Sequence, residues 1–349
     1  MSETKLMESL VWLGPREMEI QQSAIPELRS GEVLIAVRAA GICGSELSGY
    51  LGQNSLRVPP LVMGHEAAGQ IIQSTEGTFA DGSPARTGER VTFNPLVVCG
   101  MCDRCRAGLT NLCRQRQLIG AHRPGAFAQF VAVPATQCHP LPEGLSDTIA
   151  SLTEPLACSL RAVKLTQVRS EQSLLILGAG PIGLFALIAA RAEGIKRVYV
   201  SDLSESRLAV ARQWGASETI NVQKRDVLAT IQEIAPGGID TVIDAVGANV
   251  TRAQAVQAAV PGGTVVFIGL HDESSSLATN YLVRQEITIR GSFSYDQGDF
   301  KQAFDFLTHG LLQAGTDWLE ERPLAAGPSS FAELVDGQVA ATKIVLRVN

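Results

Sequence analysis

The sequence lacks the features that mark a membrane protein, a secreted protein or a nucleic-acid-binding protein. Charged residues interrupt every apolar stretch before it reaches the roughly 18 residues that a membrane-spanning helix needs. Residues 1–5 do not show the basic-then-apolar order of a secretory signal peptide, which favours a cytoplasmic protein. The 29 Lys and Arg residues are outnumbered by 35 Asp and Glu, and this net charge of -6 disfavours nucleic acid as a partner, because phosphate backbones are held by clustered cations.

The chain also has no internal repeat and no low-complexity tract, and its hydrophobic content of 45% argues against general disorder. Its 349 residues exceed the usual size of one domain, so two domains are expected. Short apolar runs broken by glycine and proline between residues 30 and 135 predict an irregular antiparallel β domain. The expected strands there are 33–37, 70–72, 90–93 and 128–133.

From residue 148 onward the pattern changes to alternating helices and strands. A helix is expected over residues 148–167, with Ser146 and Asp147 as its cap. The strands expected after it are 173–177, 197–200, 239–243 and 264–268, and the helices between them are 181–191, 204–214 and 249–259. Such alternation is typical of a doubly wound parallel sheet. Further strands are expected at 287–291, completing this sheet, and at 343–348.

A glycine-rich turn joins the first of these strands to the helix that follows it. Gly178, Gly180 and Gly183 form the pattern G-x-G-x-x-G, and Pro181 and Ile182 open the helix. The glycines permit a tight turn, a close approach of the backbone to a pyrophosphate, and close packing of helix on strand. The N–H groups at the start of the helix, together with its dipole, favour phosphate binding. This loop is therefore a predicted dinucleotide site.

The strand after this helix is followed by an acidic residue, about 20 residues beyond the loop. An acid at this position distinguishes NAD from NADP. Asp202 would accept hydrogen bonds from both ribose hydroxyls and would repel a 2′-phosphate. This predicts NAD as the cofactor and makes NADP less favoured, although Arg207 could still help to bind a 2′-phosphate. The competing interpretation is a plain strand–turn–helix with Asp202 facing solvent.

Four of the seven cysteines crowd into a stretch of fifteen residues. This layout is poorly suited to a disulfide framework in a chain of this length. The spacing C-x2-C-x2-C-x7-C suits four thiolates around one zinc ion, and a closed all-thiolate shell is the mark of a structural site. An iron–sulfur cluster is less favoured, because the bacterial ferredoxin pattern closes with a shorter spacing and a proline. The predicted ligands are Cys99, Cys102, Cys105 and Cys113.

Four further residues are candidate metal ligands, although they come from three places far apart in the sequence: Cys43, the adjacent His65 and Glu66, and Glu154. Taken singly, each has an ordinary structural explanation, as a packed thiol, a core histidine or an acid favoured by a helix dipole. The residues around them carry more information than their spacing does.

The order of these short motifs resembles a known family. Gly-Ile-Cys-Gly-Ser at 41–45, Gly-His-Glu at 64–66, the four-cysteine segment, Glu-Pro-Leu-Ala at 154–157 and the glycine-rich loop follow one another as in the zinc-dependent medium-chain dehydrogenase/reductase family. The chain is most similar to its polyol (sorbitol-like) and threonine dehydrogenase branches. The resemblance implies an α/β protein in which a Rossmann domain interrupts a GroES-like irregular β-barrel catalytic domain. The expected domains are 1–152 with 294–349 for catalysis, and 153–293 for NAD binding.

The resemblance also assigns roles to the dispersed residues. Cys43 and His65 would bind a catalytic zinc ion, and Glu66 and Glu154 would share the remaining ligand position, directly or through water. Cys158 is a rival ligand, because some relatives use a second cysteine in this region. With the four-cysteine segment, this implies two zinc ions per chain, one catalytic and one structural.

The implied reaction is hydride transfer between a secondary alcohol, polyol-like or cyclitol-like, and NAD, giving a ketone. Zinc with an open position acts as a Lewis acid on the substrate oxygen, and Ser45 resembles the residue that passes the alcohol proton along. The runner-up is an amino-alcohol or hydroxy-acid dehydrogenase such as threonine dehydrogenase, whose substrate carboxylate would require a cation that the sequence does not reveal. A non-catalytic nucleotide-binding protein is a third alternative. A homodimer or homotetramer is expected.

Three positions depart from the family pattern. Glu46 stands where an Asp usually orients the zinc-bound histidine, so this role requires a backbone that accommodates one more methylene. Ser48 replaces a histidine that ends the proton relay in many relatives, so protons would leave through ribose hydroxyls and water. The segment 293–295, Phe-Ser-Tyr, lacks the arginine that helps to bind a polyol in sorbitol-like enzymes, which weakens the polyol assignment.

Overall fold

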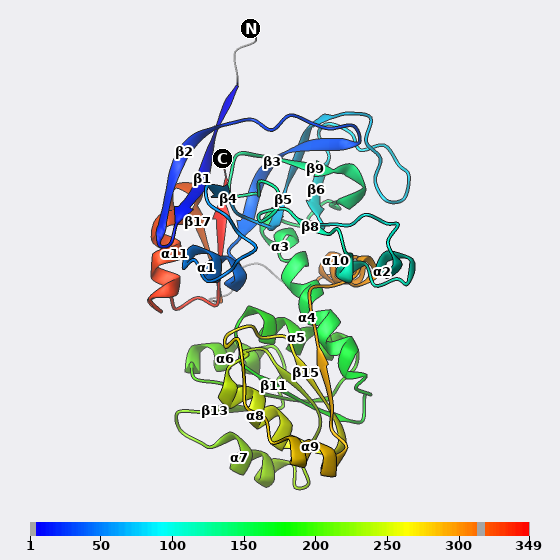
Figure 1. The fold of residues 1–349 in the computed structure, drawn as a ribbon, viewed down its shortest axis with the longest axis vertical. Helices are drawn as coiled ribbons and strands as arrows, with labels where there is room; N and C mark the ends of the chain where they lie inside the picture. Colours follow the sequence, from blue (N-terminus) through cyan, green and yellow to red (C-terminus); the bar gives the residue numbers. More distant parts are fainter. Residues whose placement is uncertain (1–4, 313–317, 349) are drawn as a thin grey trace. The chain divides into compact units, whose positions relative to one another are not determined.

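The computed structural model describes residues 5–312 and 318–348, and the chain divides into two compact units (Figure 1). The first unit combines Met1–Glu154 with Asp296–Asn349, and the second is Pro155–Tyr295. The first unit is therefore assembled from both ends of the chain, and the second from one continuous segment. Among the described helices, none is long and apolar enough to cross a membrane.

The main sheet of the first unit is largely antiparallel. Its strands follow the order β10-β6-β5-β3-β18-β17, and β9 also pairs with β3. Their bounds are β3 Glu32–Gly41, β5 Glu66–Ser74, β6 Arg90–Phe93, β9 Phe130–Pro134, β10 Cys138–Pro140, β17 Leu319–Pro323 and β18 Lys343–Arg347. Strand β18 lies antiparallel to β3 and parallel to β17. A strand from the end of the sequence thus lies beside the strand that leads into residues 41–45.

Among the residues that the structure describes, two smaller sheets and five helices complete the first unit. The smaller sheets are β2-β1-β4, with bounds Glu17–Ala24, Leu6–Gly14 and Leu61–Val62, and β7-β8, with bounds Leu96–Val97 and Gln117–Leu118. The helices are α1 Gly44–Tyr50, α2 Asp103–Arg106, α3 Asp147–Ser151, α10 Gln297–Thr308 and α11 Gly327–Val335. Single 3-10 turns are Thr110–Leu112, Ala135–Gln137 and Leu324–Ala326. One hydrophobic core unites the strands with α11 through Phe331, whose ring packs 5.8 Å from that of Phe127.

The second unit contains a six-stranded parallel sheet in the order β13-β12-β11-β14-β15-β16. Numbered along the chain this is the order 3-2-1-4-5-6, which defines the dinucleotide-binding Rossmann topology. The bounds are β11 Ser173–Leu177, β12 Arg197–Asp202, β13 Glu218–Asn221, β14 Ile239–Asp244, β15 Ala259–Phe267 and β16 Thr288–Gly291. The expected doubly wound parallel sheet is confirmed.

Helices cover both faces of this sheet. All five residues of β11 are buried, and because alternate residues of a strand point to opposite faces, neither face of β11 is exposed. Leu175 and Leu177 pack in one cluster with Val227 and Ile231 of α7. Helices α5 and α6 contact β12 and each other, whereas α7 contacts α8 and α8 lies against β14 and β15. The helices are α4 Thr153–Thr166, α5 Pro181–Ala192, α6 Glu205–Gln213, α7 Val227–Ile234, α8 Asn249–Ala258 and α9 Thr279–Gln285.

One expected helix is divided in two. The pattern at 148–167 predicts a single helix, but α3 ends at Ser151 and α4 begins at Thr153. The predicted cap is confirmed, because the Ser146 hydroxyl accepts a hydrogen bond from the backbone N–H of Ile149. The Thr153 hydroxyl instead bonds back to the carbonyl of Ala150 at 2.8 Å, a competing local bond that accompanies the break.

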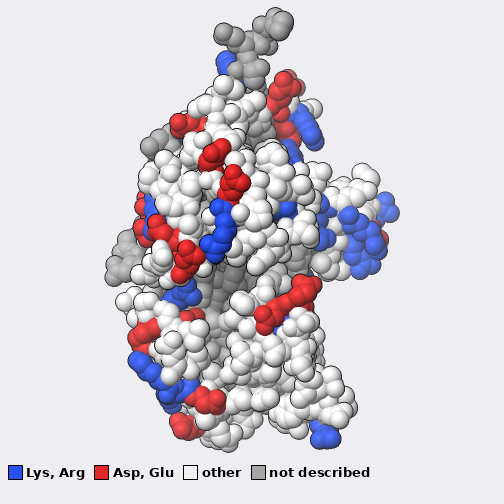
Figure 2. All heavy atoms as spheres, turned by 60° about the vertical axis from the view of Figure 1, so that its left-hand side comes forward, with Lys and Arg blue, Asp and Glu red and all other residues white. Residues whose placement is uncertain are grey.

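Basic and acidic side chains are interspersed over most of the face drawn in Figure 2, apart from a basic cluster at its right-hand edge. Among the described residues, several charges neutralise one another in pairs, such as Arg16 with Asp336 and Arg322 with Glu333. The mixed pattern follows from the nearly balanced numbers of the two signs in the sequence.

Candidate active site

Three side chains from two separate parts of the sequence meet in the first unit. Cys43 precedes α1, His65 directly precedes β5, and Glu66 is the first residue of β5, where it pairs with Gly41 at the end of β3. The potential ligand atoms of Cys43, His65 and Glu66 all lie within 4.8 Å of one another. Sulfur, imidazole nitrogen and carboxylate oxygen are the donor types that zinc accepts. The register of β3 against β5 therefore creates a candidate metal site.

Glu46 holds the histidine in one orientation. The Oε1 atom of Glu46 lies 2.8 Å from His65 Nδ1 and accepts a hydrogen bond of 2.8 Å from the Gly64 N–H. Its Oε2 accepts a 3.0 Å bond from the Cys43 N–H. Because a carboxylate can only accept, His65 Nδ1 carries the proton and Nε2 keeps its lone pair for a metal ion. Helix α1 accommodates the extra methylene of Glu46, so the structure supplies the contact that the sequence left conditional.

Burial and neighbouring charges act in opposite directions on these groups. Burial by itself lowers the pKa of His65, but the negative charges of Glu46 and Cys43 outweigh burial and raise that pKa well above its usual value. Burial raises the pKa of Glu46, yet His65 and the more distant Arg57 bring it below its ordinary value. Such a cluster of anionic donors stabilises positive charge on His65, as either a proton or a metal ion.

Glu66 has one oxygen paired and one oxygen free. Its carboxylate is fully buried and forms an ion pair with Lys343, the first residue of β18. Lys343 also donates a 2.8 Å hydrogen bond to the carbonyl of Ile42. The remaining oxygen, Oε1, has no hydrogen-bond donor among the residues that the structure describes. A buried carboxylate oxygen without a donor is costly unless a cation binds it, so Glu66 fits the role of a metal ligand.

A glycine makes this ion pair possible. A Cβ atom on Gly41 would lie 2.2 Å from Glu66 Oε2 and 3.0 Å from Lys343 Cε. The pair therefore lies directly against bare backbone at the end of β3. The burial of Lys343 beside Glu66 is a residue role that the sequence pattern did not reveal.

Ser45 lies beside the candidate metal ligands. Its hydroxyl donates toward Cys43 Sγ at 3.4 Å and accepts a bond from Arg57 Nη2 at 3.3 Å. The Ser48 hydroxyl donates to the Ser45 carbonyl at 3.0 Å and is thus held by the helix backbone. Ser45 keeps one lone pair available for the proton of a further hydroxyl group.

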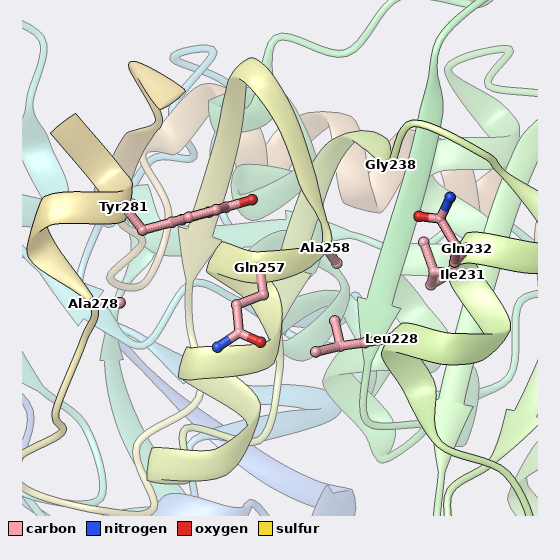
Figure 3. Close-up of a pocket in the computed structure, with 8 residues that line it drawn as sticks. All are labelled: Leu228, Ile231, Gln232, Gly238, Gln257, Ala258, Ala278 and Tyr281. Atoms are coloured by element: carbon pink, nitrogen blue, oxygen red, sulfur yellow. The ribbon is translucent and has the colours of Figure 1, made fainter. Parts of the chain in front are cut away.

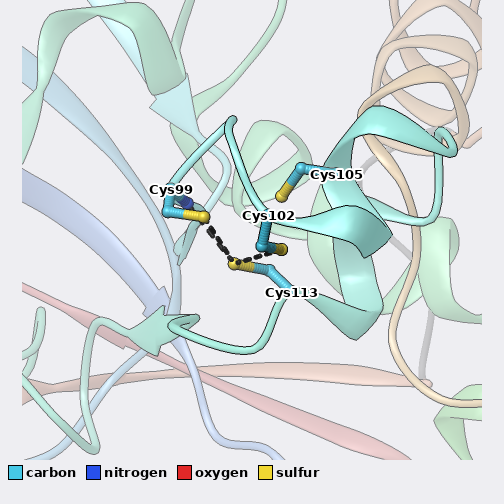
Figure 4. A group of neighbouring side chains, drawn as sticks. All are labelled: Cys99, Cys102, Cys105 and Cys113. Atoms are coloured by element: carbon cyan, nitrogen blue, oxygen red, sulfur yellow. Dashed lines mark hydrogen bonds between the residues drawn. The ribbon is translucent and has the colours of Figure 1, made fainter.

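The four cysteines of the second cluster converge on one point (Figure 4). The Sγ atoms of Cys113 and Cys99 are 3.5 Å apart, and those of Cys102 and Cys113 are 4.0 Å apart. Tetrahedral zinc with bonds of about 2.3 Å to sulfur requires sulfur–sulfur distances of about 3.8 Å. The cluster therefore has the dimensions of a four-thiolate zinc site.

Backbone N–H groups already favour a thiolate at this loop. Hydrogen bonds from the backbone of Cys105 and Arg114 lower the pKa of Cys102 to about 6. Burial, together with hydrogen bonds to the neighbouring thiols, raises the pKa of Cys105 to about 12. Four thiolates cannot be held this close without a cation between them. Nearby, Arg104 and Arg114 are both engaged by Asp103, at 3.0 Å and 2.7 Å.

The glycine-rich loop has the predicted position between β11 and α5, in the second unit. Gly178 adopts a φ of +96°, which favours glycine. A Cβ on Gly183 would lie 1.8 Å from the Gly178 carbonyl oxygen, so this glycine brings helix and strand together. A Cβ on Gly180 would meet no atom within 4 Å, which leaves its backbone open to a ligand. Pro181 starts the helix at its first position, next to the open N–H groups of Ile182 and Gly183.

Asp202 closes the same loop from the end of β12. Its Oδ2 accepts a 2.7 Å bond from the Ala179 N–H, and its Oδ1 accepts a 2.8 Å bond from the Ser204 N–H. The carboxylate is thereby fixed between the glycine-rich turn and the start of α6, which also carries Arg207. Each oxygen has a second lone pair for a ribose hydroxyl.

Comparisons with known proteins agree with this arrangement. The alcohol dehydrogenase GroES-like domain matches residues 29–143, and the zinc-binding dehydrogenase domain matches residues 181–309. The sorbitol dehydrogenase of Bacillus subtilis is 32% identical over 313 residues, which cover 88% of this chain and 87% of that protein. The chain belongs to the zinc-dependent medium-chain alcohol dehydrogenase family.

Solved structures of this dehydrogenase family share the fold. A dehydrogenase of Escherichia coli CFT073 in complex with NADH has a TM-score of 0.89 and 29% identity, over 98% of this chain and 99% of that one. A zinc-binding dehydrogenase of Sinorhizobium meliloti 1021 bound to NADP has a TM-score of 0.87 and 28% identity, over 98% and 99%. These likenesses confirm the expected GroES-like and Rossmann architecture of the chain.

Two of the ligand candidates do not belong to the central trio of this family member. Among the described residues, the group that meets at the candidate metal site contains neither Glu154 nor Cys158. Glu154 is buried in the first turn of α4 and is the last residue of the first unit, whereas Cys158 belongs to the second unit. Their contributions to metal binding remain predictions.

Two aromatic residues of this dehydrogenase follow site motifs in the sequence, where they could line a pocket or belong to the core, and the structure places both in the core. The Tyr50 hydroxyl donates to the carbonyl of Arg16 at 3.1 Å, and its ring packs 5.5 Å from that of Phe331. Phe93 is fully buried in the same hydrophobic core. The sequence could not separate these alternatives, because an aromatic residue near a site motif looks the same in a pocket and in a core.

The second unit also carries a groove of about 370 Å³ beside α7, α8 and α9 (Figure 3). It is lined by Leu228, Ile231, Gln257 and Tyr281, among others. None of the lining residues belongs to the glycine-rich loop or to the two cysteine-containing clusters, so the groove plays no part in the candidate active site.

Proposed function

We propose that the protein is a zinc-dependent oxidoreductase that transfers hydride between a secondary alcohol, such as a polyol, sugar alcohol or cyclitol, and NAD, forming a ketone. The observation that carries the proposal is the convergence of Cys43, His65 and Glu66, with Glu46 fixing the histidine tautomer. A merely structural role would not require a buried Glu66 oxygen without a donor. The similarity to sorbitol dehydrogenase favours a polyhydroxylated substrate.

Cys43, His65 and Glu66 would hold the catalytic zinc, and Glu154 would complete the ligand set directly or through water. When bound, zinc supplies a Lewis acid that lowers the pKa of a substrate alcohol. Ser45 lies close enough to Cys43 to receive the alcohol proton on its free lone pair. Ser48 cannot carry that proton onward as a histidine would, because its own proton is bonded to the Ser45 carbonyl.

The second unit, Pro155–Tyr295, would bind the dinucleotide. The N–H groups beside Gly180 and Pro181 would hold the pyrophosphate, and Asp202 would hold the ribose hydroxyls. The nicotinamide, when bound, accepts the hydride. Asp202 favours NAD over NADP because a 2′-phosphate would meet a carboxylate that is already fixed by two N–H donors.

The disputed ligand has its own test. Glu154→Ala should lower the occupancy of one zinc ion per chain, whereas Cys158→Ser should leave both occupancies unchanged. The reverse pattern would assign the position to Cys158. A loss in neither variant would reduce the ligand set to Cys43, His65 and Glu66.

The main experiment is a screen for NAD reduction by zinc-replete protein. Polyols, cyclitols, sugar acids and amino alcohols should be offered with NAD and with NADP, and the metal content should be measured on the same samples. About two zinc ions per chain and NADH formation with at least one secondary alcohol support the proposal. Two zinc ions without turnover of any alcohol over a range of pH values would refute it.

Self-association as a dimer or tetramer is part of the proposal. Strand β16 ends the parallel sheet and leaves one edge unpaired among the described strands. Leu270 and Val283, which both precede β16 in the sequence, are 83% and 76% exposed. An open sheet edge and exposed apolar side chains in the same unit favour pairing with another chain. The free thiol ligands fit a reducing, cytoplasmic setting.

A further inference from the structure

The loop between α1 and β4 buries a charged residue and exposes its apolar neighbours. Arg57 is only 4% exposed, whereas Leu56 and Val58 on either side of it are 47% and 71% exposed. The usual preference is the reverse, because burying a cation without a counter-charge is costly. This loop therefore folds so as to place the guanidinium of Arg57 inside the first unit.

The buried guanidinium is only partly satisfied. Its Nη2 donates to the Ser45 hydroxyl at 3.3 Å, and its buried Nε has no hydrogen-bond partner among the described residues. Nor does any described carboxylate form an ion pair with Arg57. Buried arginines are normally paired with a carboxylate or a phosphate. Arg57 lacks such a partner among the described residues. Its guanidinium lies next to the Ser45 hydroxyl, which is proposed to receive the substrate's proton.

Glu46 cannot supply the missing partner. It lies near enough for the charge of Arg57 to lower its pKa, but its two oxygens are already engaged by the N–H groups of Gly64 and Cys43 and by His65. Glu66 is likewise paired, with Lys343. Counting a Cys43 thiolate, Glu46 and Glu66 against Lys343 and a divalent cation gives a neutral cluster. Arg57 then adds one uncompensated positive charge.

The position of the guanidinium is fixed by close packing. A Cβ on Gly49 of α1 would lie 2.6 Å from Arg57 Cδ, so the aliphatic stem of Arg57 lies directly on the helix backbone. The Arg57 N–H also donates to the carbonyl of Asn54 at 3.2 Å, and the Asn54 side chain reaches the Ser45 carbonyl at 3.5 Å. The loop is thus tied to the same residue that its guanidinium contacts. A preorganised cation of this kind is what a binding site for an anion requires.

We propose that Arg57 binds an anionic group of the substrate, so that the preferred substrates are secondary alcohols that carry a carboxylate or a phosphate close to the carbinol carbon. This inference rests on the proposed function of Ser45. A substrate hydroxyl on Ser45 would lie within about 6 Å of Arg57 Nη2, given the 3.3 Å contact and one further hydrogen bond. An acidic group one or two carbons from the carbinol spans that distance and can pair with the guanidinium. Neutral polyols would leave the charge of Arg57 unpaired.

The test compares binding of matched ligands to the zinc-replete, full-length protein with NAD present. Hydroxy acids, the neutral alditols of the same carbon number and the phosphate monoesters of those alditols are titrated by calorimetry. Wild-type protein should bind one anionic class at least about ten-fold more tightly than the alditols. Arg57→Met should abolish that preference, so that the ratio of anionic to neutral affinity falls to about one. The two anionic arms distinguish a carboxylate from a phosphate.

Two further variants control for charge and for position. Arg86→Met removes an exposed arginine of the same unit and should keep the wild-type preference. Gly49→Ala keeps the charge but displaces the stem of Arg57, so it should weaken anion binding while circular dichroism shows a folded protein. Equal affinity for anionic and neutral ligands in wild-type protein, or a preference that survives Arg57→Met, would overturn the inference.

Turnover measured on the same samples separates this inference from the proposed function. Anion binding that depends on Arg57, without oxidation of any alcohol, upholds the anion site and refutes the dehydrogenase. NADH formation from neutral alditols, with no Arg57-dependent preference, upholds the dehydrogenase and refutes the anion site.

Discussion

Replacing Glu46 with Gln exchanges one carboxylate oxygen for an NH2 group. Glu46 is the side chain that orients His65 in the candidate active site. The Glu46 carboxylate meets three N–H groups: those of Gly64 and His65 on Oε1, and that of Cys43 on Oε2. Glutamine offers one oxygen and one NH2 group. Whichever way the amide is oriented, its NH2 group faces at least one N–H donor, so at least one buried donor loses its acceptor.

The two orientations of the amide have different consequences. An amide nitrogen facing Cys43 leaves one backbone N–H unsatisfied, at a cost of about 1–3 kcal/mol in the free energy of unfolding. An amide nitrogen facing His65 requires the histidine to move its proton to Nε2, which removes the lone pair that a metal ion needs. In both cases the negative charge beside His65 is lost. We therefore expect the affinity of the catalytic zinc to fall about 10–100-fold.

The assay is a competition titration with a zinc chelator, in which the release of the two zinc ions per chain is resolved. The matched control is Glu32→Gln, a second buried glutamate of the same unit, which binds Arg123 and the Arg29 N–H instead of a candidate ligand. Glu32→Gln should lower stability without changing zinc affinity. Catalytic zinc affinity in Glu46→Gln within about two-fold of wild type would refute the assignment of Glu46 as the residue that orients His65.

Three further predictions concern the second zinc site, the nucleotide loop and acid stability. Cys113→Ser should remove one of the two zinc ions and lower the melting temperature; metal analysis showing two retained ions would contradict a four-thiolate site. Gly183→Ala should destabilise the protein by about 1–3 kcal/mol in denaturant unfolding, because its Cβ would lie 1.8 Å from a carbonyl oxygen. Gly180→Ala, with no atom within 4 Å, should keep stability and weaken NADH binding, and equal destabilisation by both would contradict the packing described. Burial, with the charge of Lys301, lowers the pKa of His139 to about 4. The unfolded chain therefore binds this proton first as the pH falls below about 6.5, and stability is lost progressively down to pH 4, by at most about 3 kcal/mol. His139→Phe, which keeps a ring against Phe300 at a wild-type spacing of 5.1 Å, should remove that loss in unfolding curves measured across this pH range.

The parallel sheet was the most predictable part of the fold. Strands such as β11 are buried on both faces and read as continuous apolar runs, so the predicted bounds 173–177 agree with Ser173–Leu177. The hairpin of β1 and β2 was not predicted, because in β2 only Met18 is buried and the apolar signal is weak. Strand β17, with the sequence LEERP, has no fully buried residue and was missed for the same reason.

The residues that meet at the two candidate metal sites could be predicted because their residue types are rare and their local motifs are distinctive. The charged residues that lie beside these candidate ligands could not be predicted. Lys343 and Glu66 meet only because β18 is placed beside β3, and nothing in the local sequence reports that neighbour. Arg57 lies in an irregular loop whose alternation of exposed and buried residues follows no helix or strand period. Its importance depends on a contact with Ser45 that only the folded loop creates.

The pairing of β18 with β3 determines when, during synthesis, the first unit can complete its folding. Lys343 bonds to the carbonyl of Ile42, a residue 301 positions earlier. At about 5–20 residues per second, roughly 15–60 s separate the emergence of these two residues from the ribosome. During that interval Cys43, His65 and Glu66 are present without the lysine that neutralises Glu66, while the continuous segment Pro155–Tyr295 already contains every strand of its own sheet. The dinucleotide-binding half can therefore mature on the nascent chain, whereas the metal centre is completed only after the last strand has been made.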